Sequence, residues 1–261
     1  MKNIMHCWKN GEIMKTELSN KTTIFTVGDS LVQTYTEDYA PMTGWGQMLP
    51  IYFNEAHVVV KNHAIGGRSS GSFLREGRFD KVLQDLQPGD YVLIEFGHND
   101  ATWNKPERYV PVLDFKANLT KHYIAATRQC GGIPILITLV NRNDYDPNTG
   151  KFNVSFPEYV QATREVAAET AAPLIDLNAM TVEYFDRLNH EYGIGATETK
   201  IFNHAKPGEY AGVYANGVAD NTHLQKAGAM IVAGMVAKSF RTLGIDKLAR
   251  WYREPESYNI T

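Results

Sequence analysis

Short apolar runs alternate along the chain with longer segments in which apolar and polar positions follow helical spacing. Five runs are rich in β-branched, aliphatic and aromatic residues, a composition typical of strands buried on both faces. These predicted strands are residues 23–27, 57–61, 91–96, 133–139 and 173–175. The predicted helices are residues 46–55, 73–86, 114–128, 157–171, 177–192 and 224–243. This alternation predicts an α/β fold with a parallel sheet covered by helices.

Two long connections interrupt the alternation. Residues 141–156 are rich in Asn, Asp, Gly and Pro, and residues 193–221 contain several Gly and Tyr. Connections of that length in a compact domain are usually functional or disordered, and open parallel sheets bind ligands at the carboxyl ends of their strands. We expect one domain over residues 21–249, with an N-terminal extension of residues 1–20 and an exposed tail of residues 250–261.

The composition is that of a globular protein. The 261 residues are 43% hydrophobic and 21% charged, which suffices for one domain with a sizeable core. A formal net charge of −3 argues against non-specific nucleic-acid binding, because such binding needs a basic face. No apolar run reaches the length of a membrane span, so we expect no membrane partner.

Cysteine usage and the start of the chain bear on the compartment. Cys7 and Cys130, the two cysteines, could form one disulfide, but two scattered thiols are more typical of a reducing compartment. Residues 1–21 lack the apolar stretch of a secretory signal, so we expect a cytoplasmic protein. The eight histidines show neither an HExxH pattern nor zinc-site spacing with cysteines, so no metal is predicted.

The first predicted strand ends in Gly28-Asp29-Ser30. The glycine allows a sharp turn off the strand, and residues 31–35 can begin a helix whose N-terminus would favour negative charge near the Ser30 hydroxyl. Ser30 could therefore be a nucleophile. In the alternative reading, Asp29 or Ser30 is only a helix cap.

Two further predicted strands also end in small or polar residues. Gly66-Gly67 follows the second strand, where backbone N–H groups can face a cleft as oxyanion donors. Asn99 follows the third, and its amide can donate to an oxyanion without a charge. Each group could instead form an ordinary turn. Because the carboxyl ends of neighbouring parallel strands meet at one edge of the sheet, their coincidence favours a shared site.

A candidate acid–base pair precedes the last predicted helix. Asp220 and His223 lie three residues apart, so the carboxylate can accept from one ring nitrogen while the other nitrogen faces a nucleophile. In the alternative reading, Asp220 or Thr222 caps the helix and His223 is incidental.

Taken together, these motifs resemble the four blocks of the SGNH (GDSL) hydrolase superfamily, in order, over nearly the whole chain. Within it, the segments GWGQMLP, NHAIGGRSSGSFLREGRF, GDYVLIEFGHND and THLQKAGA are similar to the rhamnogalacturonan acetylesterase family. The resemblance implies a flavodoxin-like three-layer α/β/α sandwich with a five-stranded parallel sheet, and a reaction that needs no cofactor.

The resemblance also implies residue roles. Ser30 would be the nucleophile, His223 the general base and acid, and Asp220 the carboxylate that orients His223. The oxyanion hole would comprise the backbone N–H groups of Ser30 and Gly67 and the side chain of Asn99. Removing one such donor generally costs about 2.7–4 kcal/mol of transition-state stabilisation, so Asn99 is expected to matter measurably.

Substrate contacts are expected from the loops 103–110, 141–156 and 193–221. The candidate substrate-binding residues are Arg68, Arg75, His98, Trp103, Arg142, Tyr210 and Tyr214. The aromatic residues could stack on sugar rings, and Arg68 and Arg75 could pair with a galacturonate carboxylate. Ordinary loop packing, or pairing of the arginines with Glu76 or Asp80, is the alternative.

The predicted activity is removal of O-acetyl groups from pectin-derived, rhamnogalacturonan-type saccharides through an acetyl-enzyme intermediate, with an acetylated oligosaccharide as the partner. One alternative is the same machinery acting on acetylated xylan or on short-chain acyl esters or thioesters. A more distant alternative is a non-catalytic carbohydrate-binding protein.

Overall fold

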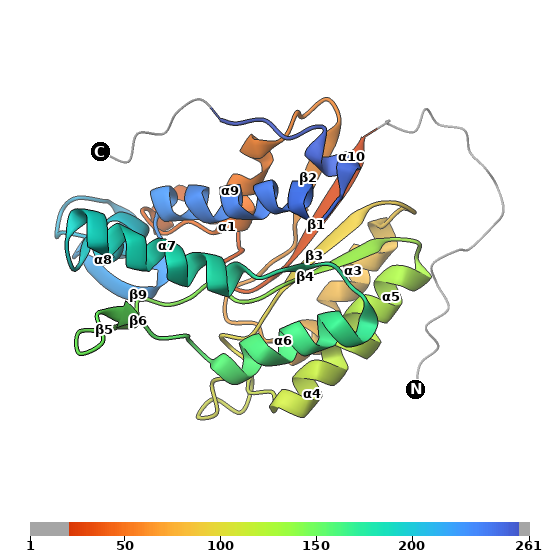
Figure 1. Cartoon of the computed structure of the whole chain (residues 1–261), viewed down its shortest axis with the longest axis horizontal. Helices are drawn as coiled ribbons and strands as arrows, with labels where there is room; N and C mark the ends of the chain where they lie inside the picture. Colours follow the sequence, from red (N-terminus) through yellow and green to blue (C-terminus); the bar gives the residue numbers. More distant parts are fainter. Residues whose placement is uncertain (1–20, 256–261) are drawn as a thin grey trace.

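A five-stranded parallel sheet forms the centre of the computed structural model, which describes residues 21–255 (Figure 1). Its strands are β1 (Thr22–Gly28), β2 (Val58–Asn62), β3 (Tyr91–Glu95), β4 (Ile133–Ile137) and β7 (Leu174–Ile175). The spatial order is β2-β1-β3-β4-β7, and every pairing is parallel. This order matches flavodoxin-like doubly wound sheets. The predicted fold class and all five predicted strands are confirmed.

Alternate side chains of the strands enter two separate cores. Ile24, Leu93 and Ile135 belong to one buried cluster, whereas Phe25 and Val92 belong to the other. The first face is covered by α1 (Trp45–Met48), α7 (Leu177–Tyr192) and α9 (Lys226–Thr242). The second is covered by α2 (Ser70–Arg75), α3 (Arg78–Asp85), α4 (Val112–Ala117), the π-helical turn η3 (Asn118–Ile124), α5 (Ala125–Gln129) and α6 (Pro157–Thr170). Helices on both faces complete the three layers (Figure 1).

Two predicted helices are divided in the structure. The segment 46–55 begins as α1 and continues as the short 3-10 helix η2 (Leu49–Tyr52), which has Pro50 in its first turn. The segment 73–86 is split into α2 and α3 because Gly77 takes a left-handed conformation with φ of 65°. Local backbone chemistry therefore breaks segments whose apolar spacing was continuous.

Both long connections contain secondary structure that the sequence analysis missed. The segment 141–156 includes a hairpin of β5 (Tyr145–Asp146) and β6 (Lys151–Phe152). The segment 193–221 includes α8 (Ala196–Ile201), β8 (Phe202–Ala205) and the 3-10 helix η4 (Gly212–Tyr214), and it leads into β9 (Val218–Leu224). Strand β9 pairs antiparallel with β8. Most of these elements are too short for sequence periodicity to reveal them. Strand β9 is as long as β1, but its sequence VADNTHL is largely polar and only partly buried, so it leaves no apolar run. A further 3-10 helix, η1 (Glu37–Tyr39), precedes α1.

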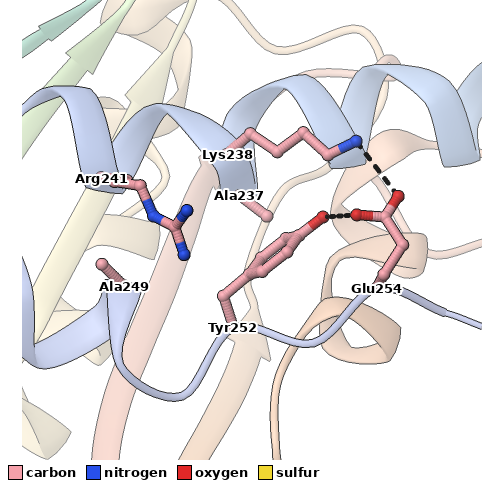
Figure 2. Close-up of a pocket in the computed structure, with 6 residues that line it drawn as sticks. All are labelled: Ala237, Lys238, Arg241, Ala249, Tyr252 and Glu254. Carbon is pink, nitrogen blue, oxygen red and sulfur yellow. Dashed lines mark hydrogen bonds and ion pairs between the residues drawn. The ribbon is translucent and has the colours of Figure 1, made fainter.

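The C-terminal segment contacts the domain through Trp251, Tyr252 and Glu254, while Arg250, Arg253 and Glu254 are exposed. The expectation of an exposed tail from residue 250 stays a prediction. After α10 (Asp246–Ala249), Trp251 stacks on His57, and Tyr252 stacks on Tyr52. Figure 2 shows the Tyr252 hydroxyl donating to Glu254, whose carboxylate also pairs with Lys238 on α9. These groups line a cavity of about 230 Å³.

Cys130 is disulfide-bonded, which differs from the expectation of two reduced thiols. Cys7 lies outside the described residues, as do the predicted N-terminal extension and residues 256–261. Within residues 21–255, no helix has both the length and the apolar character needed to cross a membrane. The domain boundaries and the cytoplasmic location stay predictions.

Gly28 tests the steric constraint at the end of β1. A Cβ at this position would lie 2.7 Å from the Glu95 carbonyl oxygen and 2.7 Å from Val32 Cγ2. We expect Gly28→Ala to lower the free energy of unfolding by about 1–3 kcal/mol, measured by urea denaturation. Adding Val32→Ala should relieve part of this loss, so the double variant should be less destabilised than the sum of the single variants. Strict additivity would contradict the steric explanation.

Candidate active site

Ser30 lies in a turn at the carboxyl end of β1, and Asn99 lies in the turn that follows the neighbouring strand β3. The predicted helix after Ser30 is absent, because the carbonyl groups it would use are bonded elsewhere. Leu31 O accepts from Trp45 N at 2.8 Å, and Val32 O accepts from Asn62 Nδ2 at 2.6 Å. The Asp29 carboxylate accepts the Leu31 N–H at 3.0 Å and so stabilises the turn.

The structure brings Ser30, His223 and Asp220 into one hydrogen-bonded chain. The Ser30 Oγ lies 2.9 Å from His223 Nε2, and His223 Nδ1 lies 2.7 Å from Asp220 Oδ2. Ser30 and His223 are 193 positions apart in the sequence, so only the fold creates this contact. The predicted meeting of these three side chains is therefore realised.

Hydrogen bonding determines which nitrogen of His223 carries the proton in the resting site. An ionised carboxylate only accepts, so Nδ1–H donates to Asp220 and Nε2 presents a lone pair to the Ser30 hydroxyl. Burial acts to raise the pKa of Asp220, but hydrogen bonds from His223 and from the Thr222 N–H outweigh it and lower the pKa below its ordinary value. Asp220 is therefore ionised at neutral pH.

The Gly66-Gly67 turn, which supplies one candidate oxyanion donor, lies beside Ser30. Gly66 is so close that a Cβ on it would lie 3.4 Å from Ser30 Cβ. Gly67 has φ of 77°, a conformation that side-chain-bearing residues rarely adopt. Within residues 21–255, neither the backbone N–H of Ser30 nor that of Gly67 donates a hydrogen bond to another group of the protein. Both N–H groups are therefore available to a developing oxyanion.

The Asn99 amide is held on both sides. Its Nδ2 donates to Arg68 O at 3.1 Å and makes a longer contact of 3.3 Å with Asp29 Oδ2. Its Oδ1 accepts from Arg108 Nη1 at 2.9 Å. The sequence analysis missed Arg108, because nothing in its loop marks it as a partner of a residue at the end of β3.

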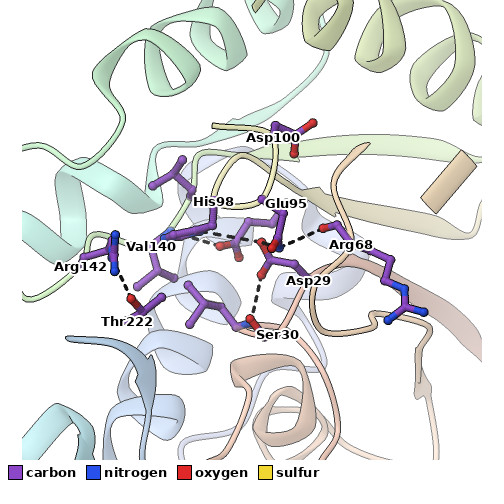
Figure 3. Close-up of polar contacts among 12 residues, drawn as sticks. Asp29, Ser30, Arg68, Glu95, His98, Asp100, Val140, Arg142 and Thr222 are labelled. Atoms are coloured by element: carbon purple, nitrogen blue, oxygen red, sulfur yellow. Dashed lines mark hydrogen bonds and ion pairs between the residues drawn. The ribbon is translucent and has the colours of Figure 1, made fainter. Parts of the chain in front are cut away.

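Three buried carboxyl groups surround the floor of the site, as Figure 3 shows for Asp29, Glu95 and Asp100. Burial raises the pKa of Glu95 to about 8, with a further contribution from the charge of Asp29. Burial likewise raises the pKa of Asp29 to about 6 and that of Asp100 to about 7. Glu95 was treated as part of an apolar strand, but its carboxyl accepts from Trp45 Nε1 and from Val140 N. Asp100 accepts from Ser70 at the start of α2.

His98 is buried rather than open to a ligand. Its Nδ1 lies 3.9 Å from Asp29 Oδ2 (Figure 3). Its ring meets Phe156 edge-on at 5.7 Å. Burial lowers the pKa of His98 to about 3, so the ring is neutral at physiological pH. The expectation that His98 binds substrate stays a prediction, and its surroundings indicate a neutral packing role.

The predicted carboxylate-binding arginines are engaged within the protein. Arg68 Nε contacts both oxygens of Glu76 at 3.2 Å, the pairing that the sequence analysis kept as an alternative. Arg75 Nη2 donates to Glu107 O at 2.8 Å and lines a separate pocket of about 550 Å³ beside α4. Neither side chain is free to turn toward an incoming carboxylate without losing these contacts.

The remaining predicted substrate residues fall into different settings. The Trp103 side chain is 79% exposed, whereas the Tyr214 hydroxyl donates to Met42 Sδ at 3.3 Å. Tyr210 is half-buried. Arg142 donates to Thr222 Oγ1 at 2.7 Å (Figure 3). It also donates to Asn221 Oδ1 at 2.7 Å and so ties the loop 141–156 to β9.

A pocket of about 290 Å³ lies beside this tie. It is lined by Arg142, Asp144, Val154, Ser155, Phe156 and Asn221. Asn221 adjoins Asp220, so the loop 141–156 forms one wall close to the acid–base pair. Among residues 21–255, no group of three or more His, Cys, Asp or Glu side chains is placed to hold a metal ion.

The fold and this hydrogen-bonded serine define an acylhydrolase, and the chain belongs to the GDSL-like lipase/acylhydrolase family, which matches residues 26–229. It is therefore a carboxylic ester hydrolase. The chain is 40% identical to the probable rhamnogalacturonan acetylesterase YesY of Bacillus subtilis strain 168, over 85% of this chain and 94% of that protein. The family resemblance expected from the four motifs is confirmed.

A second relative and a solved structure extend the comparison. The rhamnogalacturonan acetylesterase RhgT of the same strain is 38% identical, over 85% of this chain and 90% of that protein. The crystal structure of the Bacillus subtilis protein YxiM superposes with a TM-score of 0.70 and 27% identity. That match covers 86% of this chain and 57% of the YxiM chain.

Glu95 predicts a pH dependence of stability. With its folded-state pKa near 8, Glu95 keeps a proton that the unfolded chain loses above about pH 4.3, so the free energy of unfolding should fall as pH rises from about 5 to 8. Glu95→Gln removes this titration and should make the fall shallower. The glutamine has only one acceptor oxygen, so its NH2 group must face the N–H of either Trp45 or Val140. The lost hydrogen bond should lower the free energy of unfolding by about 1–3 kcal/mol at pH 5.

Chemical denaturation of both proteins across this pH range measures the two effects separately. The stability curves of wild type and Glu95→Gln should approach each other as pH rises. Parallel curves would show that Glu95 does not keep its proton in the folded protein.

Proposed function

We propose that this protein is a serine esterase that removes O-acetyl groups from pectin-derived, rhamnogalacturonan-type saccharides through an acetyl-enzyme intermediate. The observation that carries the ester chemistry is the contact of Ser30 Oγ with His223 Nε2 at 2.9 Å, in line with the contact of His223 Nδ1 with Asp220. Support for the substrate class comes from YesY and RhgT, both of which bear the name rhamnogalacturonan acetylesterase.

In the first half of the reaction, His223 Nε2 takes the Ser30 proton while Oγ attacks the acetyl carbonyl carbon. The carbonyl π electrons move to oxygen and give a tetrahedral oxyanion. The bond from the acetyl carbon to the sugar oxygen then breaks, and the sugar oxygen takes the proton from His223. Asp220, which stays ionised, stabilises the imidazolium between these two steps.

In the second half, water replaces the sugar. His223 takes a proton from the water as the water oxygen attacks the acetyl carbon of the intermediate. The second tetrahedral species collapses by breaking the bond to Ser30 Oγ, which recovers its proton from His223. Acetate leaves, and the site returns to its starting state without any cofactor.

The oxyanion of both steps is assigned to three donors, the backbone N–H groups of Ser30 and Gly67 and the Asn99 amide. The two backbone groups are held by the turn after β1 and by the left-handed conformation of Gly67, so they need little reorganisation when charge develops. Trp103 and the pocket beside Arg142 are the surfaces proposed to contact the sugar chain.

Ser30→Ala tests the nucleophile. Removing the hydroxyl should abolish acetate release from p-nitrophenyl acetate and labelling by a fluorophosphonate, because it removes the oxygen that His223 Nε2 contacts and activates. The far-UV circular dichroism spectrum should stay that of the wild type, since the Ser30 side chain contributes little to packing. A variant that keeps near wild-type turnover would remove Ser30 from the mechanism.

A substrate panel tests the substrate class. Free acetate is measured with acetylated rhamnogalacturonan oligosaccharides and with acetylated xylo-oligosaccharides, and hydrolysis of acetyl and octanoyl p-nitrophenyl esters is compared. We expect the highest kcat/KM on the rhamnogalacturonan oligosaccharides and faster turnover of acetyl than of octanoyl esters. A preference for xylo-oligosaccharides or for octanoyl esters would reassign the substrate while leaving the serine chemistry in place.

A further inference from the structure

The Arg108 guanidinium lies against both non-serine members of the candidate oxyanion hole. Its Nη1 donates to Asn99 Oδ1 at 2.9 Å. On its other side it faces Gly67, where a Cβ would lie 3.9 Å from Nη2 and 4.0 Å from Nη1. The Arg108 side chain is 27% exposed, so this contact is largely shielded from water.

Three contacts together determine the orientation of the Asn99 amide. Arg108 can only donate, so it must face the amide oxygen. The carbonyl oxygen of Arg68 and the carboxylate of Asp29 only accept, so they must face the amide nitrogen. With the amide turned over, a donor would face a donor and an acceptor would face two acceptors. Arg108 thus helps to keep Nδ2, the donating end of Asn99, on the side of Asp29 and the Arg68 carbonyl. An oxyanion would take the N–H that makes the longer contact with Asp29, at 3.3 Å.

The charge of Arg108 adds a second effect. A cation that donates to an amide oxygen draws electron density from the amide and makes its N–H groups stronger donors, because linked hydrogen bonds polarise one another. Asn99 is uncharged, but in this arrangement it transmits part of the guanidinium charge to the place where the oxyanion develops. This geometry explains how the neutral amide of Asn99 can stabilise an oxyanion.

The loop that carries Arg108 is anchored close to the site. Val110 N donates to Asp100 O at 3.0 Å, which closes the loop back onto the end of β3. Arg75 Nη2 donates to Glu107 O at 2.8 Å, and Arg108 N donates to Lys105 O at 3.0 Å. These bonds hold the backbone of Arg108 before any substrate arrives, as a positioning residue requires.

We propose that Arg108 is a positioning residue that orients and polarises Asn99 for oxyanion stabilisation. This inference rests on the proposed serine esterase mechanism but not on the identity of the sugar. Arg108 acts through Asn99 rather than by touching the acyl group. Its contribution should therefore appear in the transition state and should depend on the presence of Asn99.

A double-mutant cycle on p-nitrophenyl acetate hydrolysis tests the proposal. We expect Arg108→Ala to lower kcat by about 10- to 100-fold with KM changed by less than about 3-fold, a smaller loss than the roughly 10²- to 10³-fold typical of removing an oxyanion donor. In the Asn99→Ala background the same change should lower kcat by less than about 2-fold, because Arg108 then has no amide to orient.

Two further variants separate charge and geometry from simple loss of structure. Arg108→Lys keeps a charged donor without the planar fork and should recover part of the kcat lost in Arg108→Ala. Lys121→Ala removes an exposed cation from η3, outside the loops of the site, and should leave kcat and KM unchanged. Thermal melting of each variant verifies that losses of kcat are not losses of folded protein.

Each outcome has a distinct reading. Equal losses in the wild-type and Asn99→Ala backgrounds, or a rise in KM with kcat unchanged, would overturn the proposal and indicate direct contact of Arg108 with substrate. A wild type that hydrolyses p-nitrophenyl acetate but not acetylated rhamnogalacturonan would overturn the substrate class alone. A wild type that hydrolyses neither ester and is not labelled by a fluorophosphonate would overturn both proposals.

Discussion

The parallel pairing of β1 with β3 is the constraint on which the site depends. Gly28 and Glu95, the last residues of the two strands, are register partners. The chain leaving β1 reaches Ser30 two residues later, and the chain leaving β3 reaches Asn99 four residues later. This is the point where the strand order reverses, so the helices that follow the two strands, α1 and α4, pack on opposite faces of the sheet. Open α/β sheets bind ligands at such a point. The nucleophile and the amide are neighbours because β1 and β3 pair there.

Several ionisable side chains are buried at the same edge of the sheet. Asp29, Glu95, Asp100 and His98 are all buried beneath the reacting groups. Each carboxyl is bonded to donors from separate segments, such as Trp45, Ser70 and Asn99, so the polar floor joins loops that follow different strands. Burying these groups costs stability, and in return the loops have few alternative arrangements. A rigid floor is what preorganised oxyanion donors require.

The acid–base pair is positioned differently, by loops rather than by the sheet. Asp220 and His223 lie in β9, which is held from both sides. Thr43 N donates to Leu224 O at 2.8 Å, and Asn143 N donates to Asn221 O at 2.8 Å. Thr43 lies just before α1, and Asn143 lies in the loop after β4. Both segments therefore influence the distance between His223 and Ser30. Substitutions in either segment can alter catalysis without touching a reacting atom.

Strand composition and helical spacing determined the α/β class and the five strands, because burial on both faces leaves a strong apolar signal. The four motifs determined the family and the groups that meet, because a strand-end serine, an amide and an Asp–His pair are local patterns. Only the tertiary structure decided that Ser30 begins a turn and not a helix, that Glu95 is a buried acid, and that Arg108 faces Asn99. Those outcomes arise from hydrogen bonds and desolvation between segments remote in sequence, and local periodicity carries no information about such contacts.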